Sequence, residues 1–463
     1  MGSLPNITAP GLEVEGRRVT VFGMARSGVA AARVLVSRGA AVTVVDEKPA
    51  EQLQTVIADV ETAGARAVTL VHDYDQLAQP EIVIVSPGVP TAHPLLAQAR
   101  AAGAYVIGEI ELAYRLCTSP IIAVTGTNGK GTVVRLIGRM LQRGGLDAPV
   151  VGNIGTPLVS VVDGRHDALV TEVSSFQLET IDRFAPWVSA ILNISPDHRD
   201  RHPTMDEYVA AKSRIFENQS ADGFTILNID DPLVAGLRTA TPARVLTVSL
   251  QSADADARLE GDELVIAHPA GTRRVVCSVD DIPLGGPHNI SNALTAALAA
   301  SVCGVEVEAM AGAIAAQEPA EHLLRDAGTV NGVRFIDDSK ATNPAAATAD
   351  LSAVDGPVVL IAGGDPKGLD LSEFARVAAE RAEHIVLIGQ SARALAEAIG
   401  NPAQITFAAS MQGAVEAAFA ASQPGWTVLL APACASFGMF RNMSERGEVF
   451  CGAVRALADK HGV

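Results

Sequence analysis

The sequence predicts an α/β protein of three consecutive α/β domains: a Rossmann-like N-terminal domain, a central P-loop-type mononucleotide-binding domain and a Rossmann-like C-terminal domain. Short runs rich in Val, Ile and Leu alternate with helical patterns along the chain, as expected for βαβ units and parallel sheets. Glycine-rich turns follow several of these runs. At 463 residues the chain is also too long for a single hydrophobic core. We place the domains at residues 1–108, 109–319 and 320–463.

Each predicted domain repeats a cycle of strand and helix. In the first domain we expect a helix near residues 28–37 and strands at 19–23, 42–46, 82–86 and 105–107. The second has an amphipathic run at 133–143, a helical region at 292–316 and strands at 121–125, 168–172, 189–193 and 224–228. The third has strands at 333–337, 358–364, 384–389 and 427–432.

Composition narrows the class of protein. The net charge of −17 argues against a broad nucleic-acid or anionic-membrane surface. No apolar run is long enough to span a bilayer, and residues 1–10 lack the basic start and apolar run of a secretory signal. Five scattered cysteines form neither a disulfide framework nor a zinc motif. We expect a reduced, cytoplasmic, monomeric protein without nucleic-acid partners or membrane insertion.

The most informative stretch is residues 121–132, IIAVTGTNGKGT. A β-branched run stops at Gly126, and a glycine-rich turn carrying Lys130 leads into the amphipathic run. Glycines let backbone N–H groups approach a phosphate chain, the following helix presents its positive end, and the lysine adds a point charge. This pattern predicts a nucleoside-triphosphate site.

A second glycine turn, residues 23–28 (GMARSG), nearly matches the dinucleotide-binding fingerprint, and Asp46 closes the next strand. Three interpretations stay open: a tight strand–helix turn without a ligand, an NAD site, or a site for another diphosphate such as that of a UDP-sugar. Residues 86–88 (SPG), after another strand, would add backbone donors there.

Polar residues also follow other strands. Glu172 ends a strand expected beside the one that feeds the phosphate loop, where a carboxylate can hold Mg²⁺. His198 follows another strand in a charged turn with Asp197 and Asp200, which makes a metal role plausible. Lys212 lies on a predicted helix and by its residue type alone would be a surface lysine.

Three strand ends of the last domain are polar or glycine-rich: residues 337–343 (DDSKATN), 362–368 (AGGDPKG) and 431–438 (APACASFG). Together they indicate one binding edge, and Lys340 and Lys367 suit it to an anionic ligand.

With these segments assembled, the chain resembles the Mur ligase family, and within it the members that add D-glutamate. The resemblance covers nearly the whole chain in the family's order. It rests on GTNGKGT, VGNIG (151–155), EVSSFQLE (172–179), ILNISPDHRDRH (191–202), AAKSRIF (210–216), HNISNA (288–293), DDSKATN and PACASF. It implies an ATP-dependent ligase of peptidoglycan precursor synthesis that adds D-glutamate to UDP-N-acetylmuramoyl-L-alanine through an acyl phosphate.

The resemblance also implies roles for individual residues. Lys130, His198 and Lys212 would be catalytic. The phosphates of ATP would lie on Gly126, Thr127, Asn128, Gly129, Lys130, Gly131 and Thr132, and other parts of ATP would contact Asn289, Asn292 and Asp338. Two Mg²⁺ ions would be held by Thr132, Glu172, His198 and a carbamylated Lys212. Asn153 and Ser175 would contact the muramoyl group, with Arg26, Ser27, Asp46, Ser86, Pro87 and Gly88 around the uridine diphosphate. Lys340, Thr342, Lys367 and Ser436 would line the D-glutamate and phosphate region.

The chain departs from the family pattern at two positions. Gly131 stands where many members have Ser or Thr, and Leu323 stands where the family has an arginine that reaches ATP, with Arg325 as the candidate replacement. Three rival functions stay open: a folylpolyglutamate synthase-like ligase, which shares the phosphate loop; an NAD-dependent oxidoreductase, which fits residues 23–28 and Asp46; and a nucleotide-binding relative without catalysis, which Leu323 allows.

Overall fold

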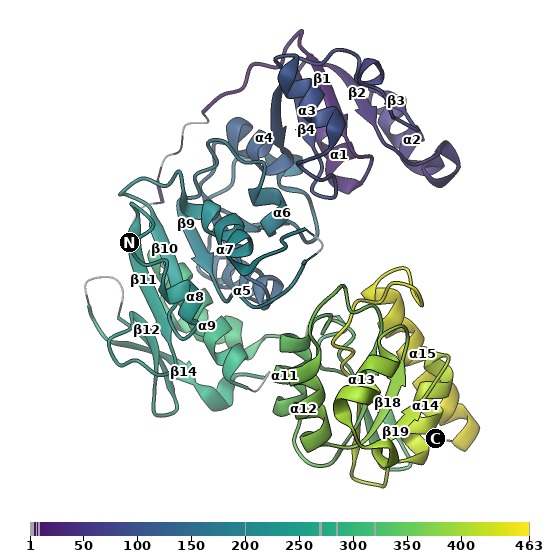
Figure 1. Cartoon of the computed structure of the whole chain (residues 1–463). Helices are drawn as coiled ribbons and strands as arrows, with labels where there is room; N and C mark the ends of the chain where they lie inside the picture. The colour runs from purple at the N-terminus through teal and green to yellow at the C-terminus, as the bar shows by residue number, and fades with distance from the viewer. Residues whose placement is uncertain are drawn as a thin grey trace. The chain divides into compact units, whose positions relative to one another are not determined.

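The computed structural model describes residues 4–5, 7, 10–199, 201–267, 271–283, 286–318 and 321–462. These residues form three sheets, which confirms the predicted α/β class with three successive sheets (Figure 1). The chain divides into two compact units. The first comprises Met1–Ile194, Asp206–Ile282 and Asn289–Ala316, and the second comprises Ser195–Met205, Pro283–His288 and Gln317–Val463. The predicted boundary at residues 319–320 and the predicted Asp200 lie outside the described residues.

The N-terminal sheet is parallel and has the order β3-β2-β1-β4-β5. Its strands are β1 (Arg18–Phe22), β2 (Ala41–Val45), β3 (Arg66–Val68), β4 (Ile82–Val85) and β5 (Tyr105–Gly108). Its helices are α1 (Arg26–Ser37), α2 (Gln54–Thr62) and α3 (Pro94–Ala101), with short 3₁₀ turns η1 (Ala50–Gln52) and η2 (Tyr74–Leu77). The strand order reverses between β1 and β4, so ligand-binding loops are expected at the carboxyl ends of these strands.

The central sheet has the order β14-β13-β12-β11-β10-β9-β6-β8-β7. Its strands are β6 (Ile121–Thr125), β7 (Val150–Gly152), β8 (Leu169–Glu172), β9 (Val188–Ile191), β10 (Phe224–Asn228), β11 (Arg244–Ser249), β12 (Ala257–Glu260), β13 (Glu263–Ile266) and β14 (Arg274–Ser278). The helices in this part of the chain are α4 (Glu109–Leu116), α5 (Lys130–Arg143), α6 (Ser175–Leu178), α7 (Met205–Ser213), α8 (Pro232–Ala235), α9 (Pro287–Val302) and α10 (Val307–Ala315), with 3₁₀ turns η3 (Leu158–Val161), η4 (Arg214–Phe216) and η5 (Val279–Asp281).

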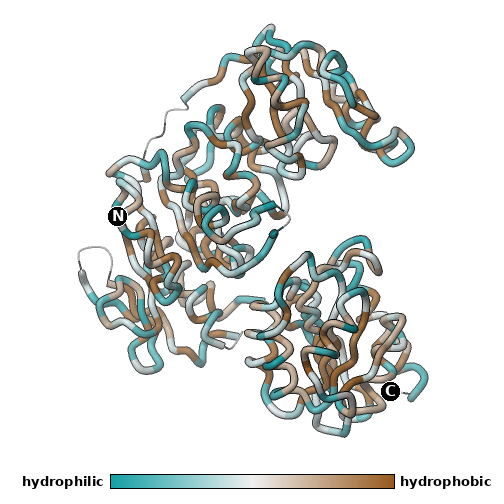
Figure 2. Tube along the Cα trace, in the orientation of Figure 1, coloured by the Kyte–Doolittle hydropathy of each residue, from teal (hydrophilic) through white to brown (hydrophobic). Residues whose placement is uncertain are grey.

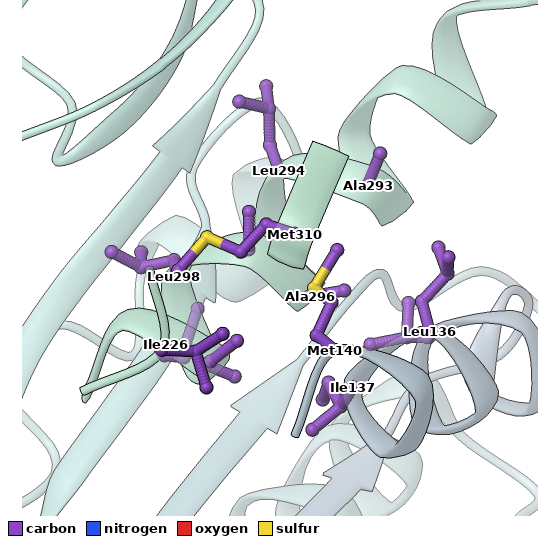
Figure 3. Packing of buried hydrophobic residues seen from close by; sticks show 14 of the residues in the cluster. Leu136, Ile137, Met140, Ile226, Ala293, Leu294, Ala296, Leu298 and Met310 are labelled. Atoms are coloured by element: carbon purple, nitrogen blue, oxygen red, sulfur yellow. The ribbon is translucent and has the colours of Figure 1, made fainter. Parts of the chain in front are cut away.

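The central core explains why the amphipathic run after the phosphate loop is helical. The buried face of α5, with Leu136, Ile137 and Met140, packs against α9 and Met310 of α10 (Figure 3). Apolar residues at i, i+1 and i+4 form one stripe of a helix, and burial of that stripe stabilises it. The predicted helical region 292–316 is two helices, since the chain turns between α9 and α10.

The C-terminal sheet has the order β15-β16-β20-β17-β18-β19. Its strands are β15 (Arg325–Val330), β16 (Val333–Asp337), β17 (Val358–Gly363), β18 (Ala382–Ile388), β19 (Ile405–Phe407) and β20 (Thr427–Leu430). Its helices are α11 (Pro344–Ala353), α12 (Ser372–Arg381), α13 (Ala392–Ile399), α14 (Met411–Ala420) and α15 (Met443–His461), with the 3₁₀ turn η6 (Pro402–Gln404). Alternate residues of β16 face opposite sides: Ile336 packs in the cluster with α11 to α13, and Phe335 in the cluster with α14 and α15.

The sequence analysis did not predict strands β3, β7, β11 to β15 and β19, nor any antiparallel pairing. β12 pairs with β11 in parallel, and antiparallel pairing then adds β13 and β14 to the central sheet and joins β15 to β16. Hydrophobic residues follow the strands through the interior of each unit (Figure 2). None of the helices in the described residues combines the length and the apolar character needed to cross a bilayer.

Candidate functional site

The loop between β6 and α5 has the backbone that the sequence predicts for a phosphate site. Gly126 and Gly129 adopt φ values of 158° and 82°, which favour glycine, and α5 begins directly at Lys130. Lys130 Nζ donates to the carbonyls of Gly126 and Thr127, both at 2.9 Å. The helix N-terminus and the lysine therefore bring positive charge to one turn of backbone, as a phosphate chain requires. Thr132 is buried in the first turn of α5.

Asn193 clamps this loop, and the sequence analysis did not single it out. Its Oδ1 accepts from Asn128 N at 2.8 Å, its Nδ2 donates to Asn128 O, and its carbonyl accepts from Thr127 N. Asn193 lies just beyond the end of β9, the strand next to β6. Asn193 could have been found from the sequence because it ends a predicted strand, and polar residues at the ends of neighbouring parallel strands meet at one edge of the sheet.

Lys212 joins the same loop. Its side chain is 1% exposed, its Nζ donates to Gly126 O at 2.8 Å, and it lies 4.4 Å from the centroid of the Tyr208 ring. Gly126 O thus accepts from both Lys130 and Lys212. Two ammonium groups on one oxygen repel each other.

Glu172 ends β8 beside Val124 of β6, two residues before Gly126. Asn153 Nδ2 donates to Glu172 Oε1 at 2.8 Å, and Arg26 Nη2 donates to Asn153 O at 3.4 Å. Glu172 Oε2 is buried and has no hydrogen-bond partner within the described part of the chain. An orphaned buried carboxylate oxygen fits a ligand of a divalent cation.

Two predicted ATP contacts, Asn289 and Asn292, are buried on α9. Asn292 lies against the phosphate loop: a Cβ on Gly129 would be 2.5 Å from Asn292 Oδ1. Position 129 therefore requires glycine for two reasons: its backbone angle, and the close approach of Asn292. Ser175 is buried in the first turn of α6, where Ser174 and Gln177 form a capping box.

In the N-terminal sheet, the turn after β1 is held by its neighbours. Asp46 accepts from Met24 N at 2.8 Å, and Ser86 Oγ donates to Gly23 O at 3.1 Å. A Cβ on Gly28 would lie 2.0 Å from Gly23 O, so the turn closes only with glycine there. Arg26 and Ser27 begin α1, while Pro87 and Gly88 follow Ser86 after β4. These predicted residues therefore gather at one edge of one sheet.

The C-terminal predictions lie on three loops after β16, β17 and β20, which are neighbouring strands. Asp365 and Ala435 exchange two backbone hydrogen bonds of 2.9 Å, which joins the loop of Lys367 to that of Ser436. The fully buried Arg446 of α15 joins the loop of Lys340 to the same region: it donates to Ser339 O, Ser339 Oγ and Cys434 O. Thr342 follows Lys340 in its loop. No sequence signal marked Arg446.

His198 lies in the second unit in a loop with φ of 51°, and its Nε2 is 3.7 Å from Asp197 Oδ2. Lys130, Lys212 and Glu172 belong to the first unit. The convergence of His198 with those residues on metal ions therefore stays a prediction.

Comparisons with known proteins identify the family. Three family models match: a Mur ligase MurD-like N-terminal domain at residues 17–108, the Mur ligase middle domain at 124–300 and the Mur ligase glutamate ligase domain at 324–434. A UDP-N-acetylmuramoylalanine–D-glutamate ligase of Pelotomaculum thermopropionicum is 42% identical over 95% of this chain and 98% of its own length. The chain belongs to the Mur ligase family.

Other relatives agree with this Mur ligase assignment. A ligase with the same name from Geobacter metallireducens is 39% identical over 96% of this chain and 99% of its own length. Among solved structures, a pseudomurein peptide ligase type C from Methanothermus fervidus has a TM-score of 0.62 at 17% identity and covers 96% of this chain and 100% of that one. MurC from Thermotoga maritima has a TM-score of 0.60 at 17% identity and covers 95% and 100%. These structures share the fold.

The structure bears on the arginine that this Mur ligase lacks. In the pairing of β15 with β16, Arg325 stands opposite Asp337, so both side chains leave the same face of the sheet. Asp337 contacts His322 and Cys451 on the α15 side. Asp338 faces the other side, where its Oδ1 accepts from Leu324 N. Arg325 and Asp338 therefore leave opposite faces of the sheet, and the replacement of the missing arginine by Arg325 stays a prediction.

Proposed function

We propose that this protein is an ATP-dependent ligase that joins D-glutamate to UDP-N-acetylmuramoyl-L-alanine in peptidoglycan precursor synthesis. The observation that carries the proposal is the near full-length match, at 42% identity, to a relative named for that reaction. The geometry supports it, because a loop with two lysines on one carbonyl and a chain of contacts from Arg26 through Asn153 to Glu172 lie in one unit.

The reaction requires two anions to meet. The substrate carboxylate attacks the γ-phosphorus of ATP, the bond to the β-phosphate oxygen breaks, and ADP leaves an acyl phosphate. Lys130, the N–H groups of the loop and the α5 N-terminus stabilise the charge that develops on the transferred phosphate. Asn153 and Ser175 orient the muramoyl end of the substrate, while Arg26, Ser27, Asp46 and the residues 86–88 bind its uridine diphosphate.

The amine of D-glutamate then attacks the acyl carbonyl carbon, phosphate leaves, and the nitrogen loses a proton to give the amide. Lys340, Thr342, Lys367 and Ser436 bind the anionic amino acid and the departing phosphate. The two backbone bonds between Asp365 and Ala435, and the bonds of Arg446, keep these loops in register. Asn289, Asn292 and Asp338 contact the remainder of the nucleotide.

Mg²⁺, expected as two ions, would be held by Thr132, Glu172, His198 and Lys212, and would supply Lewis-acid stabilisation of the phosphate oxygens. Glu172 Oε2 fits this role because it is buried and has no hydrogen-bond partner among the described residues. Carbamylation would make Lys212 an anionic oxygen ligand and would also end the repulsion between the two ammonium groups on Gly126 O.

Phosphate release tests the proposal. We expect turnover that requires ATP, UDP-N-acetylmuramoyl-L-alanine and D-glutamate together, and little turnover with L-glutamate. Turnover with a folate in place of the nucleotide sugar would favour a folylpolyglutamate synthase-like ligase. Hydride transfer with NAD, or nucleotide binding without turnover, would favour the other two alternatives. Cytoplasmic localisation and a monomeric state stay predictions of the same proposal.

A further inference from the structure

Two carboxyl side chains, Asp338 and Asp350, are buried together in the C-terminal sheet. Asp338 follows β16 on the face that also carries Ile336, and α11, which carries Asp350, packs on that face. The residues are 0% and 5% exposed. Neither carboxyl is therefore solvated as an ordinary surface aspartate would be.

The two carboxyl oxygens of Asp338 differ in their hydrogen bonds. Its Oδ1 accepts from Leu324 N at 3.3 Å, while its buried Oδ2 finds no donor in the part of the chain that the structure describes. The Asp338 and Asp350 side chains are within hydrogen-bonding contact of each other. Two ionised carboxylates are both acceptors, so this contact can be a hydrogen bond only when one of them carries a proton.

The charges around the pair do not remove the repulsion between the carboxyls. His288 Nε2 lies 3.5 Å from Asp350 Oδ1, and the positive charge of Lys340 also favours the ionised form of Asp350. Asp338 interacts with the Arg446 cation and with the Asp337 anion. Burial, followed by the neighbouring Asp350, raises the pKa of Asp338 well above its usual range, and burial raises the pKa of Asp350.

We propose that Asp338 and Asp350 share a single proton, and that Asp350 is a positioning residue that holds Asp338 in a pair of net charge −1 where the nucleotide binds. The second part rests on the proposed contact of Asp338 with ATP. The segment that bonds to Asp338 carries Leu323 and Leu324, which bring no cation. The shared proton limits the negative charge that faces the anionic nucleotide, and its loss adds a second buried charge there.

The test measures ADP affinity by calorimetry between pH 6 and pH 9 in the wild-type chain, in Asp350→Asn and in the control Asp355→Asn. The exposed Asp355 loses the same charge close by without touching the pair. In the wild type, affinity falls with rising pH, by up to about tenfold per pH unit once the shared proton is released. An amide at position 350 donates at every pH, so Asp350→Asn loses that slope, whereas Asp355→Asn keeps it. Equal slopes in all three proteins would overturn the positioning role.

Thermal unfolding without nucleotide tests the shared proton separately. The folded pair binds a proton that the unfolded chain releases near pH 4, so wild-type stability relative to Asp350→Asn falls as pH rises through the raised pKa. A Tm difference between these two proteins that is constant with pH would overturn the shared proton. Asp338→Asn gives the reciprocal result and serves if Asp350→Asn does not fold. A wild type that binds no ADP at any pH contradicts the proposed function instead, and the unfolding comparison still decides the proton.

Discussion

The two glycine turns of this chain, residues 23–28 and residues 126–132, share a topology but not a charge. Each follows a central strand of a parallel region and begins a helix, α1 or α5. The first is held by the Asp46 carboxylate and the Ser86 hydroxyl, and Arg26 is exposed beside it. The second has Lys130 and Lys212 on the carbonyl of Gly126.

This difference indicates how two turns of the same topology can suit different ligands. In both places the backbone supplies N–H groups at a helix N-terminus, but the neighbouring strands and helices supply opposite charges. The turn with two lysines suits a triphosphate, because the lysines can stabilise the negative charge of the phosphate group that is transferred. The turn with a carboxylate suits a ligand that also offers hydroxyl groups, such as a nucleoside diphosphate.

Lys130→Ala should have the largest effect. We expect kcat to fall by about 10³-fold, because the transferred phosphate loses a preorganised cation in a buried site. Arg26→Ala at the other turn is the matched comparison and should raise KM for the nucleotide sugar while kcat changes little. Steady-state kinetics with each substrate varied measure both. An equal loss of kcat in the two variants would contradict the assignment of catalysis to the central turn and of substrate binding to the N-terminal turn.

Lys212→Ala tests whether the second lysine of the central turn becomes an anion. We expect kcat to fall by about 10²-fold, as for loss of one group that acts on the transition state. A small carboxylic acid such as formate should restore part of the activity, since it replaces a carbamate but not an ammonium group. The exposed Lys460→Ala is the control. Rescue by a small amine in place of the acid would contradict the carbamate.

The turns also show which features the sequence could predict. Strand β10 at Phe224–Asn228 and strand β16 at Val333–Asp337 have the predicted bounds, because β-branched runs flanked by polar residues have one favourable state. Both glycine turns were predicted because their patterns are local. Lys212 has the residue type of a surface position, and its burial depends on tertiary contacts such as the bond to the Gly126 carbonyl, 86 residues away.

Residues that act through tertiary contacts were harder to predict. Asn193 clamps the central loop from a neighbouring strand, and Arg446 joins two loops from a distant helix. Neither forms a local pattern. Strand alternation likewise decides that Arg325 and Asp338 face opposite sides, which depends on the register of β15 with β16 and not on their closeness in sequence.

Gly28→Ala perturbs the N-terminal turn alone. The added Cβ would lie 2.0 Å from Gly23 O, so the turn must open and Arg26 must move. We expect KM for the nucleotide sugar to rise about tenfold, equivalent to about 1.4 kcal/mol, with KM for ATP unchanged. Gly236→Ala, whose Cβ would meet only ordinary contacts of 3.5 Å or more, is the control. A matching rise in KM for ATP would mean that the two turns are not independent sites.

Substitution of Glu109, in α4, should have the smallest effect on activity and a measurable one on stability. Glu109 accepts from Val159 N at 2.8 Å and from the Gln177 side chain, and burial raises its pKa to about 7. The folded chain therefore binds a proton between pH 4.5 and 7 that the unfolded chain has released, so the free energy of unfolding falls as pH rises through that window.

The expected loss is about 3 kcal/mol, since the pKa differs by about 2.5 units between the two states. Thermal and denaturant unfolding between pH 4.5 and 8 should show this slope in the wild type and in the exposed control Glu61→Gln, but not in Glu109→Gln. Gln177 also bonds to Ser174 at the start of α6, so Glu109 is linked to the segment that follows Glu172. If Glu109→Gln kept the slope, another group would cause it, and the raised pKa of Glu109 would be contradicted.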